Sequence, residues 1–533
     1  MKNIQRNKFL RFTGACAASI VLLTACEKGF EEMNAPYNMP SSGSIGDIFN
    51  SNVSSLQVSW QEQATYHSFV YQITQQVSQY ASSGYRMENA SNEMWDSYYK
   101  FLANSKMIDT LIAADPNKNN MTNIKAMNKV LRAYRTIRMT ENFGDIPYSK
   151  AGMGQYLGEN IRPGYDKQSD IYPALINDLK WAVDNFSTSA AQVSIGSSET
   201  LFKNDIALWT KFANSLRLRA AVTMYDKNPT FAGAQIAEAL NKPVIDKDEE
   251  PGLWPSKTPG LVFEMHAWSY SANQYIRLGT TMWSYLSSTN AADGSGIFDP
   301  RTKIFYEPNN AGQWKPYPQN PTTSTPGEGG DPYNDSRDNN WPAKGAGNIY
   351  SNCNYYFKDK NYIPELFITA AQVMLYKAEV YNRGMGVAKN PALAKSFYES
   401  GVKQSATFWV NMAMKTPKWV VGKPTALPTD AELAALLANP VVAYSATEAT
   451  ALSQIYAQMW IDGYRQPGDV WTLFRRTGGN LPKDPNNAGY WSNTYGIYHR
   501  YMYPTSEQDF NSANWRAATG GTESYSTKIW LEK

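Results

Sequence analysis

The side chains that most often carry catalysis are few in this sequence, and their spacing matches no familiar site. The 533 residues contain three histidines, His67, His266 and His499, and no two of them have the four-residue spacing of a helical zinc motif. Three well-separated cysteines cannot form a Cys/His metal cluster. The sequence has no GxSxG nucleophile elbow, phosphate-binding loop or dinucleotide fingerprint. We therefore expect a protein that is not an enzyme and that needs no cofactor.

Acidic residues keep two alternatives open. The run DKDEE, Asp246 to Glu250, offers oxygen ligands to a structural calcium ion, but it lacks the glycine and the spaced glutamate of an EF-hand loop. A solvated loop is the simpler interpretation. The two carboxylates of a glycoside hydrolase meet in space rather than in sequence, so the spacing of acidic residues does not decide for or against that activity.

Cys26 is the cysteine whose surroundings indicate chemistry. Four basic residues and no acidic residue precede Phe12, and an apolar stretch over 12–25 follows. This pattern is typical of a secretory signal, and the stretch is shorter than the roughly 20 residues of a membrane-spanning helix. The phrase LTAC, ending at Cys26, matches a bacterial lipobox, in which the chain is cut before a cysteine that carries a diacylglyceryl group. We predict a signal peptide over 1–25, a lipidated tether over 26–44 and a single domain over 45–533.

Loss of the signal also changes the charge. Removing its four cations takes the formal net charge from +3 to −1, which gives no electrostatic basis for binding nucleic acid. Once Cys16 leaves with the signal and Cys26 is acylated, only Cys353 remains, so an internal disulfide is impossible. The exported domain must be held together by its core.

Helical periodicity dominates the chain. Over 123–144 apolar residues recur every three or four positions, from Ile124 to Ile137, and Gly144 and Pro147 then provide a stop. Similar patterns predict helices at 54–82, 93–113, 171–186, 204–225, 230–241, 366–383, 391–414 and 449–464. Short turns between them favour a mostly α fold, a tetratricopeptide-like scaffold of antiparallel helix pairs with a degenerate repeat.

One segment departs from this pattern. Residues 266–364 are dense in Asn, Gly, Pro, Trp and Tyr and show no sustained period. Loops of this length are usually functional or disordered, and the many aromatic residues argue against disorder. We predict a large loop-rich insertion in the helical scaffold.

Several phrases together resemble one family, the SusD/RagB nutrient-binding outer-membrane lipoproteins of the Bacteroidetes. After the lipobox, FEEMNAPYNMP is similar to the opening of that family. The chain then continues in the family's order with ENFGDIPYSKA, PGYDKQSDIYPALINDLKWA, LWTKFANSLRLRAAV, FDPRTKIFY, LFITAAQVMLYKAEVYNRG, FRRTG and RYMYPTSEQDFN. The matches span roughly 26–516. Most of these phrases also have a structural interpretation: Glu379, for example, can pair with an arginine such as Arg476.

The resemblance implies a helical fold with four tetratricopeptide-like helix pairs. It also implies a non-enzymatic, surface-facing lipoprotein of the outer membrane that delivers oligosaccharide to a SusC-like TonB-dependent transporter. Some members carry peptide, so a peptide-binding lipoprotein is one alternative, and a surface glycoside hydrolase is another.

A sugar ring has an apolar C–H face and a polar rim, so its binder needs flat aromatic side chains beside polar ones. The sequence is rich in them, with 16 Trp and 35 Tyr. Two segments offer the mixture: SSGYRMENASNEMW and the loop-rich insertion. The predicted ligand-binding residues are Tyr85, Arg86 and Trp95 in the first segment and Trp268, Tyr270, Trp314, Tyr317 and Trp341 in the second.

Overall fold

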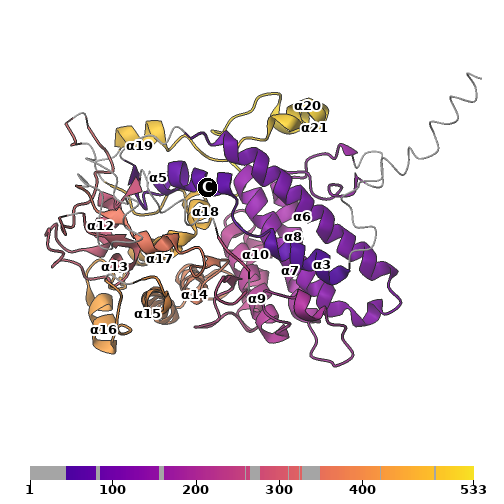
Figure 1. Cartoon of the computed structure of the whole chain (residues 1–533), viewed down its shortest axis with the longest axis horizontal. Helices are drawn as coiled ribbons and strands as arrows, with labels where there is room; N and C mark the ends of the chain where they lie inside the picture. The colour runs from indigo at the N-terminus through magenta and orange to yellow at the C-terminus, as the bar shows by residue number, and fades with distance from the viewer. Residues whose placement is uncertain are drawn as a thin grey trace, which may run out of the picture.

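The computed structural model describes residues 44–79, 85–154, 161–258, 260–263, 276–309, 311–322, 324–326, 349–419, 422–484 and 488–533. Helices dominate these residues (Figure 1), as the periodicity predicts. The predicted signal peptide, Cys26 and nearly all of the tether lie outside them. Within the described part of the chain, no helix is long and apolar enough to cross a membrane. In the same residues no group of three or more His, Cys, Asp or Glu side chains could hold a metal ion.

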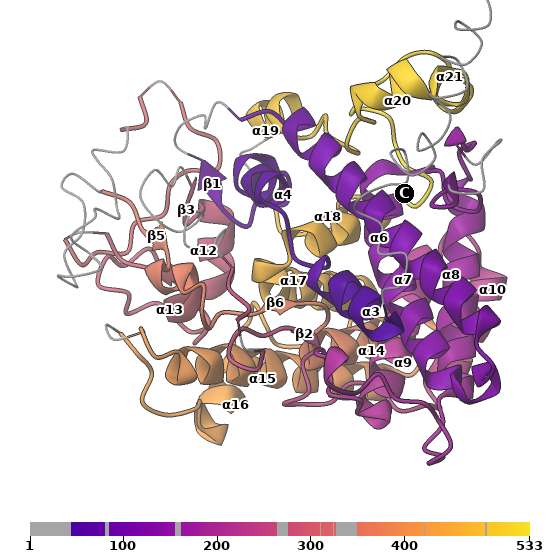
Figure 2. The ribbon, with the colours of Figure 1, turned by 45° about the vertical axis from the view of Figure 1, so that its right-hand side comes forward.

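The first half of the chain is a succession of packed helices. They are α3 (Ile45–Ser54), α4 (Trp60–Thr65), α5 (Tyr71–Ile73), α6 (Glu88–Ala114), α7 (Thr122–Phe143), α8 (Gln168–Asn185), α9 (Ile206–Met224) and α10 (Pro229–Ala239). From α6 to α10 each helix packs against the next one in the chain. Figure 2 shows α6, α7 and α8 lying side by side.

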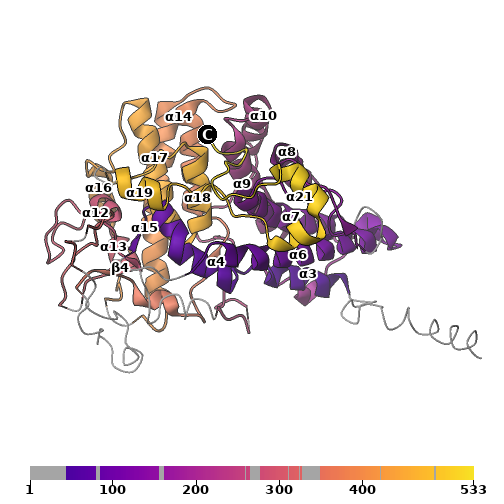
Figure 3. The same cartoon turned by 90° about the horizontal axis from the view of Figure 1, so that it is seen from above.

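A second set of helices completes the scaffold. It comprises α14 (Ala370–Arg383), α15 (Pro391–Lys415), α16 (Asp430–Ala438), α17 (Glu448–Asp462), α18 (Pro467–Arg476), α19 (Ala488–Thr494), α20 (Thr505–Phe510) and α21 (Ser512–Thr519). Helix α14 packs on α15 and α17, and it also contacts α9 of the first set, as Figure 3 shows from above. The two sets therefore share one core, and the mostly α, helix-pair architecture is confirmed.

The predicted helix over 54–82 is wrong in detail. The Ser59 side chain accepts the Glu62 N–H and begins α4, a π-helical turn η1 (Tyr66–Val70) follows, and α5 ends just before Gln75, whose φ is 56°. Residues 78–79 then form a strand, β1 (Ser78–Gln79). A local N-cap and a left-handed residue thus divide a segment that apolar spacing alone treats as one helix.

The predicted insertion contains small sheets rather than loops alone. Strand β1 joins an antiparallel sheet of order β1-β3-β5-β4, with Ser78 opposite Arg277 and Tyr306 opposite Cys353. The other strands are β3 (Ile276–Arg277), β4 (Tyr306–Glu307) and β5 (Asn352–Cys353), with short helices α12 (Thr280–Leu286) and α13 (Thr302–Phe305) and a 3-10 turn η7 (Tyr355–Lys358). Strands β2 (Gly252–Leu253) and β6 (Glu365–Leu366), which flank the predicted insertion, form a separate two-stranded antiparallel sheet.

The phrases that carry the family resemblance serve the scaffold. Gly144 ends α7 with φ 82°, and the Asp145 carboxylate accepts the N–H of Gln168 at the start of α8, at 2.8 Å. Arg476 donates two hydrogen bonds of 2.8 Å to Glu379, both buried between α14 and α18. These contacts confirm the structural interpretation of those residues.

Candidate functional site

Tyr85 and Arg86 lie immediately before α6. The Tyr85 ring is half-buried and meets Trp60 edge to face, with ring centroids 5.8 Å apart. The Arg86 side chain is 75% exposed, and its guanidinium lies 3.6 Å from the Glu88 carboxylate. An ion pair this exposed contributes little stability, so Arg86 can exchange Glu88 for another partner. Both predicted residues are therefore within reach of a ligand.

Trp95, two turns into α6, faces the core. It is 4% exposed and lies among Tyr99, Phe143 and Tyr503, with ring centroids 5.0, 5.3 and 5.6 Å away. The apolar stripe of α6 includes position 95, which is why the helix buries this ring. A ligand could contact Trp95 only after the surrounding rings had moved.

The two predicted site residues of the insertion that the structure describes are also buried. Trp314 is 8% exposed and stacks on Trp283 of α12, with centroids 5.8 Å apart and an interplanar angle of 17°. Tyr317 is 4% exposed and meets the Tyr350 ring edge to face at 4.8 Å. These two residues hold the insertion together. The other three predicted residues, Trp268, Tyr270 and Trp341, lie outside the described residues.

Three half-buried rings form a surface row that sequence reasoning missed. The Tyr498 ring lies 4.6 Å from Tyr525 and 5.2 Å from Phe69, measured between centroids. We call Phe69, Tyr498 and Tyr525 the aromatic row. Phe69 lies on the π-helical turn η1, and the tyrosines lie in loops after α19 and α21. Neither a π-helical turn nor a loop has a repeating apolar pattern that the sequence could reveal. The three residues are far apart in the sequence, and the tertiary fold brings their rings together.

The aromatic row lies beside the beginning of α6. Burial raises the pKa of Tyr498, and the nearby Tyr525 and the Glu88 carboxylate raise it further. Next to the row, Tyr495 donates a 3.0 Å hydrogen bond to Gln79, the last residue before the segment that leads to Tyr85. Figure 2 shows α19 close to the first turns of α6. Tyr85, Arg86 and the aromatic row together form what we call the α6 edge.

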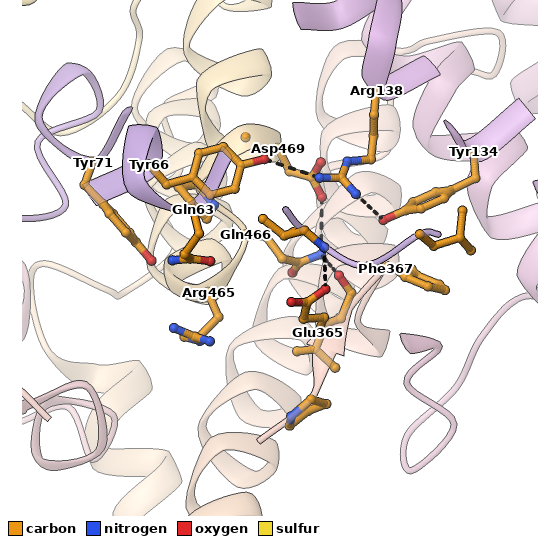
Figure 4. Close-up of a pocket in the computed structure, with 16 residues that line it drawn as sticks. Gln63, Tyr66, Tyr71, Tyr134, Arg138, Glu365, Phe367, Arg465, Gln466 and Asp469 are labelled. Atoms are coloured by element: carbon orange, nitrogen blue, oxygen red, sulfur yellow. Dashed lines mark hydrogen bonds between the residues drawn. The ribbon is translucent and has the colours of Figure 1, made fainter. Parts of the chain in front are cut away.

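A cavity lies deeper in the molecule, where η1, α7, β6 and α18 meet (Figure 4). Arg138 points between Tyr66 and Tyr134 there and donates to Glu62 at 2.9 Å and to the Tyr66 hydroxyl at 3.3 Å. On the opposite side the Gln466 amide donates to Asp469 at 3.2 Å. The lining is thus a network of paired charges and amides.

The size of this cavity excludes a sugar ligand. Its space of about 40 Å³ admits two or three water molecules, whereas ligand sites are typically 300–1,000 Å³. Burial raises the pKa of Glu365 in its wall to about 7, and its carboxylate accepts the Val58 N–H at 2.8 Å. We therefore interpret the cavity as a polar junction between the helix sets, and the α6 edge as the candidate ligand site.

Comparison with known families supports the sequence resemblance. Residues 38–504 match the family model SusD-like_2, described as starch-binding and associating with the outer membrane. The chain belongs to the SusD-like family. No curated protein matches it.

Solved structures show the same SusD-like fold. A SusD-like protein described as Bacteroidetes AC2a is 22% identical, with a TM-score of 0.71 over 92% of this chain and 100% of that one. A SusD homologue from Parabacteroides distasonis is 20% identical, with a TM-score of 0.68 over 92% and 98%. A chitin-binding SusD homologue from Flavobacterium johnsoniae is 21% identical, with a TM-score of 0.65 over 91% and 98%. At these identities the likeness establishes the SusD-like fold and leaves the ligand to be argued from the site.

Proposed function

We propose that this SusD-like protein is a non-enzymatic lipoprotein that captures oligosaccharide at the outer membrane and passes it to a SusC-like TonB-dependent transporter. The observation that carries the proposal is the α6 edge, where half-buried rings lie beside an arginine that is mostly exposed. The family description, starch-binding and associated with the outer membrane, supports the same ligand class.

The α6 edge has the two surfaces that a saccharide needs. Aromatic faces pack against the C–H faces of pyranose rings and lose little rotamer freedom on binding. Arg86 supplies several N–H donors for sugar hydroxyls, and among the described residues only the exposed pair with Glu88 competes for them. Trp268, Tyr270 and Trp341, which lie outside the described residues, stay in the proposal as ligand-binding residues, whereas Trp95, Trp314 and Tyr317 are buried and leave it.

Binding measurements on the detergent-solubilised lipoprotein test this function. We expect maltooligosaccharides or chitooligosaccharides to bind, and the variants Tyr85→Ala and Arg86→Ala each to weaken the affinity by about tenfold, because each removes contact or hydrogen bonds worth roughly 1.4 kcal/mol. Matched controls are Tyr362→Ala, which removes a half-buried tyrosine elsewhere, and Arg162→Ala, which removes an exposed arginine. Both controls should bind like the parent.

The same samples distinguish the alternatives. Oligosaccharide that becomes shorter during incubation would replace the binding function with a surface glycoside hydrolase. Binding of peptides in preference to every glycan on an array would assign the protein to peptide uptake. Unchanged affinity in both α6-edge variants would show that the ligand binds elsewhere.

A further inference from the structure

A second cavity lies on the helical scaffold, far from the α6 edge. Over the first half of α7, an open groove with a volume of about 560 Å³ lies between the last turns of α6 and the side of α8. Its lining includes Lys125 and Lys129 of α7, Ile112 of α6, Trp181 of α8, and Lys118, which lies just before α7. We call it the lysine groove. Its volume is within the usual range for small-ligand sites.

The lysine groove carries positive charge that the protein does not balance. Lys129 is paired with Asp178, and the Asp109 carboxylate in the wall accepts from Arg132 at 2.6 Å and Asn128 at 2.9 Å. Among the residues that the structure describes, no carboxylate lies within ion-pair distance of Lys118 or Lys125. Two ammonium groups are thus available to an anion, and the positive end of the 22-residue helix α7 adds to their field.

An aromatic ring lies directly beside these charges. Trp181 is half-buried, and the Lys125 and Lys129 ammonium groups lie 5.2 and 5.5 Å from the centroid of its indole. A small inorganic anion would use the lysines and leave the indole without a contact. A neutral sugar would use the indole and leave the ammonium groups of Lys118 and Lys125 unpaired. A ligand with both an apolar ring face and an anionic group uses both parts of the groove.

We propose that the lysine groove is a second saccharide site, which binds a pyranose carrying a carboxylate or a sulfate group. The acidic group pairs with Lys118 and Lys125, and the C–H face of the ring packs against Trp181. The lysine groove and the α6 edge lie at opposite ends of α6, which has 27 residues. Because each residue of a helix rises about 1.5 Å, the two sites are roughly 35–40 Å apart. The two sites can therefore be occupied independently, so neutral and acidic parts of one polysaccharide are bound at different places.

Titration calorimetry on the detergent-solubilised protein tests the proposal. The probes are trigalacturonate for a carboxylate, a sulfated disaccharide for a sulfate, maltotriose as the neutral sugar and a glutamate-rich peptide. We expect at least one acidic saccharide to bind, with an affinity that falls when NaCl rises from about 50 to about 500 mM, because salt screens the lysines. Lys125→Gln and Trp181→Leu should each weaken this binding about tenfold or more.

Control variants and probes make the outcomes decisive. Lys395→Gln removes an exposed helical lysine on α15 and should bind acidic saccharide like the parent. Circular dichroism and thermal unfolding establish that the groove variants fold. Neutral oligosaccharide binding should be unchanged in them, which separates this proposal from the function of the α6 edge. The proposal is overturned if no acidic saccharide binds, if both groove variants bind it like the parent, or if the peptide binds more tightly.

Discussion

At the scale of residues, paired charges and tyrosine hydroxyls stabilise an interior that has no disulfide. Glu379 shows the pattern, because it accepts from Arg476, from Arg383 at 3.0 Å and from the Tyr456 hydroxyl at 2.8 Å. Burial by itself raises the pKa of Glu379, but Arg476 and Arg383 outweigh it and lower that pKa below its ordinary value. Tyr172 likewise donates to buried Glu141 at 2.8 Å. Many of the tyrosines thus fill polar seams between helices.

The Glu379–Arg476 pair allows a double-mutant test. Arg476→Leu leaves Glu379 with less compensation in the core and should lower the free energy of unfolding by about 3–5 kcal/mol. The double variant Glu379→Leu with Arg476→Leu removes both charges, so it should be more stable than Arg476→Leu alone. Urea unfolding followed by circular dichroism measures both values. Equal losses in the single and double variants would show that the charge of Glu379 is not the cause.

Glu365 predicts a pH dependence of stability. Burial raises the pKa of its carboxyl from 4.5 to about 7, so the folded state holds this proton more tightly than the unfolded state. The group therefore favours folding at low pH, and this contribution is lost as the pH rises from about 4.5 through 7. Glu365→Gln should match the parent near pH 4.5 and exceed its free energy of unfolding by about 1–3 kcal/mol at pH 8. A difference that does not change with pH would contradict this assignment.

At the scale of elements, the long helices were predictable and the short elements were not. Helices α7, α8 and α9 have apolar stripes, and α7 also has a glycine stop, and both signals are properties of neighbouring residues. Strand β1 pairs with a segment about 200 positions away, and the aromatic row joins Phe69 to residues near the C-terminus. Tyr85 and Arg86 were predicted because their segment mixes aromatic and polar residues outside any clear apolar stripe, and both have exposed or half-buried side chains in the structure. Trp95 was included because its segment mixes aromatic and polar residues. That composition does not indicate which face of the helix carries the ring, and the structure places it on the buried face.

Gly144 tests the helix stop that the sequence predicted. Its φ of 82° lies in the region that favours glycine, and a Cβ there would come 3.3 Å from the Ile529 side chain. Gly144→Ala should therefore lower the free energy of unfolding by about 1–2 kcal/mol. Gly154→Ala is the matched control, because a Cβ at that position would meet no atom of the described residues within 4 Å and the φ of Gly154 is not positive. Equal stabilities for the two variants would contradict this role of Gly144.

At the scale of the whole molecule, one helix connects the two proposed sites. The α6 edge lies beside the beginning of α6, and the end of α6 lines the lysine groove, while the middle of the helix is buried in the helical scaffold. The scaffold thus sets the spacing of the sites, and the loops supply most of the side chains of the α6 edge. In the function proposed above, delivery of a captured ligand depends on how the whole molecule is held at the membrane.

The lipid anchor is the first requirement for that delivery. Because Leu23-Thr24-Ala25-Cys26 matches a lipobox, we predict that Cys26→Ser abolishes labelling by a fatty-acid probe in growing cells. A single acyl chain binds a membrane only marginally, but the several chains of a bacterial lipoprotein hold firmly. The variant should therefore leave the membrane fraction. Unchanged labelling would place the acylation at another residue or exclude it.

The SusC-like transporter is the second requirement of the proposed function. Only 18% of the residues are charged, which permits a large interface that is not highly charged. Affinity purification from gently solubilised outer membranes should recover a SusC-like transporter, identified by peptide mass, together with the parent protein.

The Cys26→Ser variant should recover much less transporter, because it no longer shares a membrane with its partner. The α6-edge variant Arg86→Ala should recover the same amount as the parent, since it alters ligand binding and not assembly. Recovery of the parent protein alone, under conditions that preserve other outer-membrane complexes, would count heavily against the partnership.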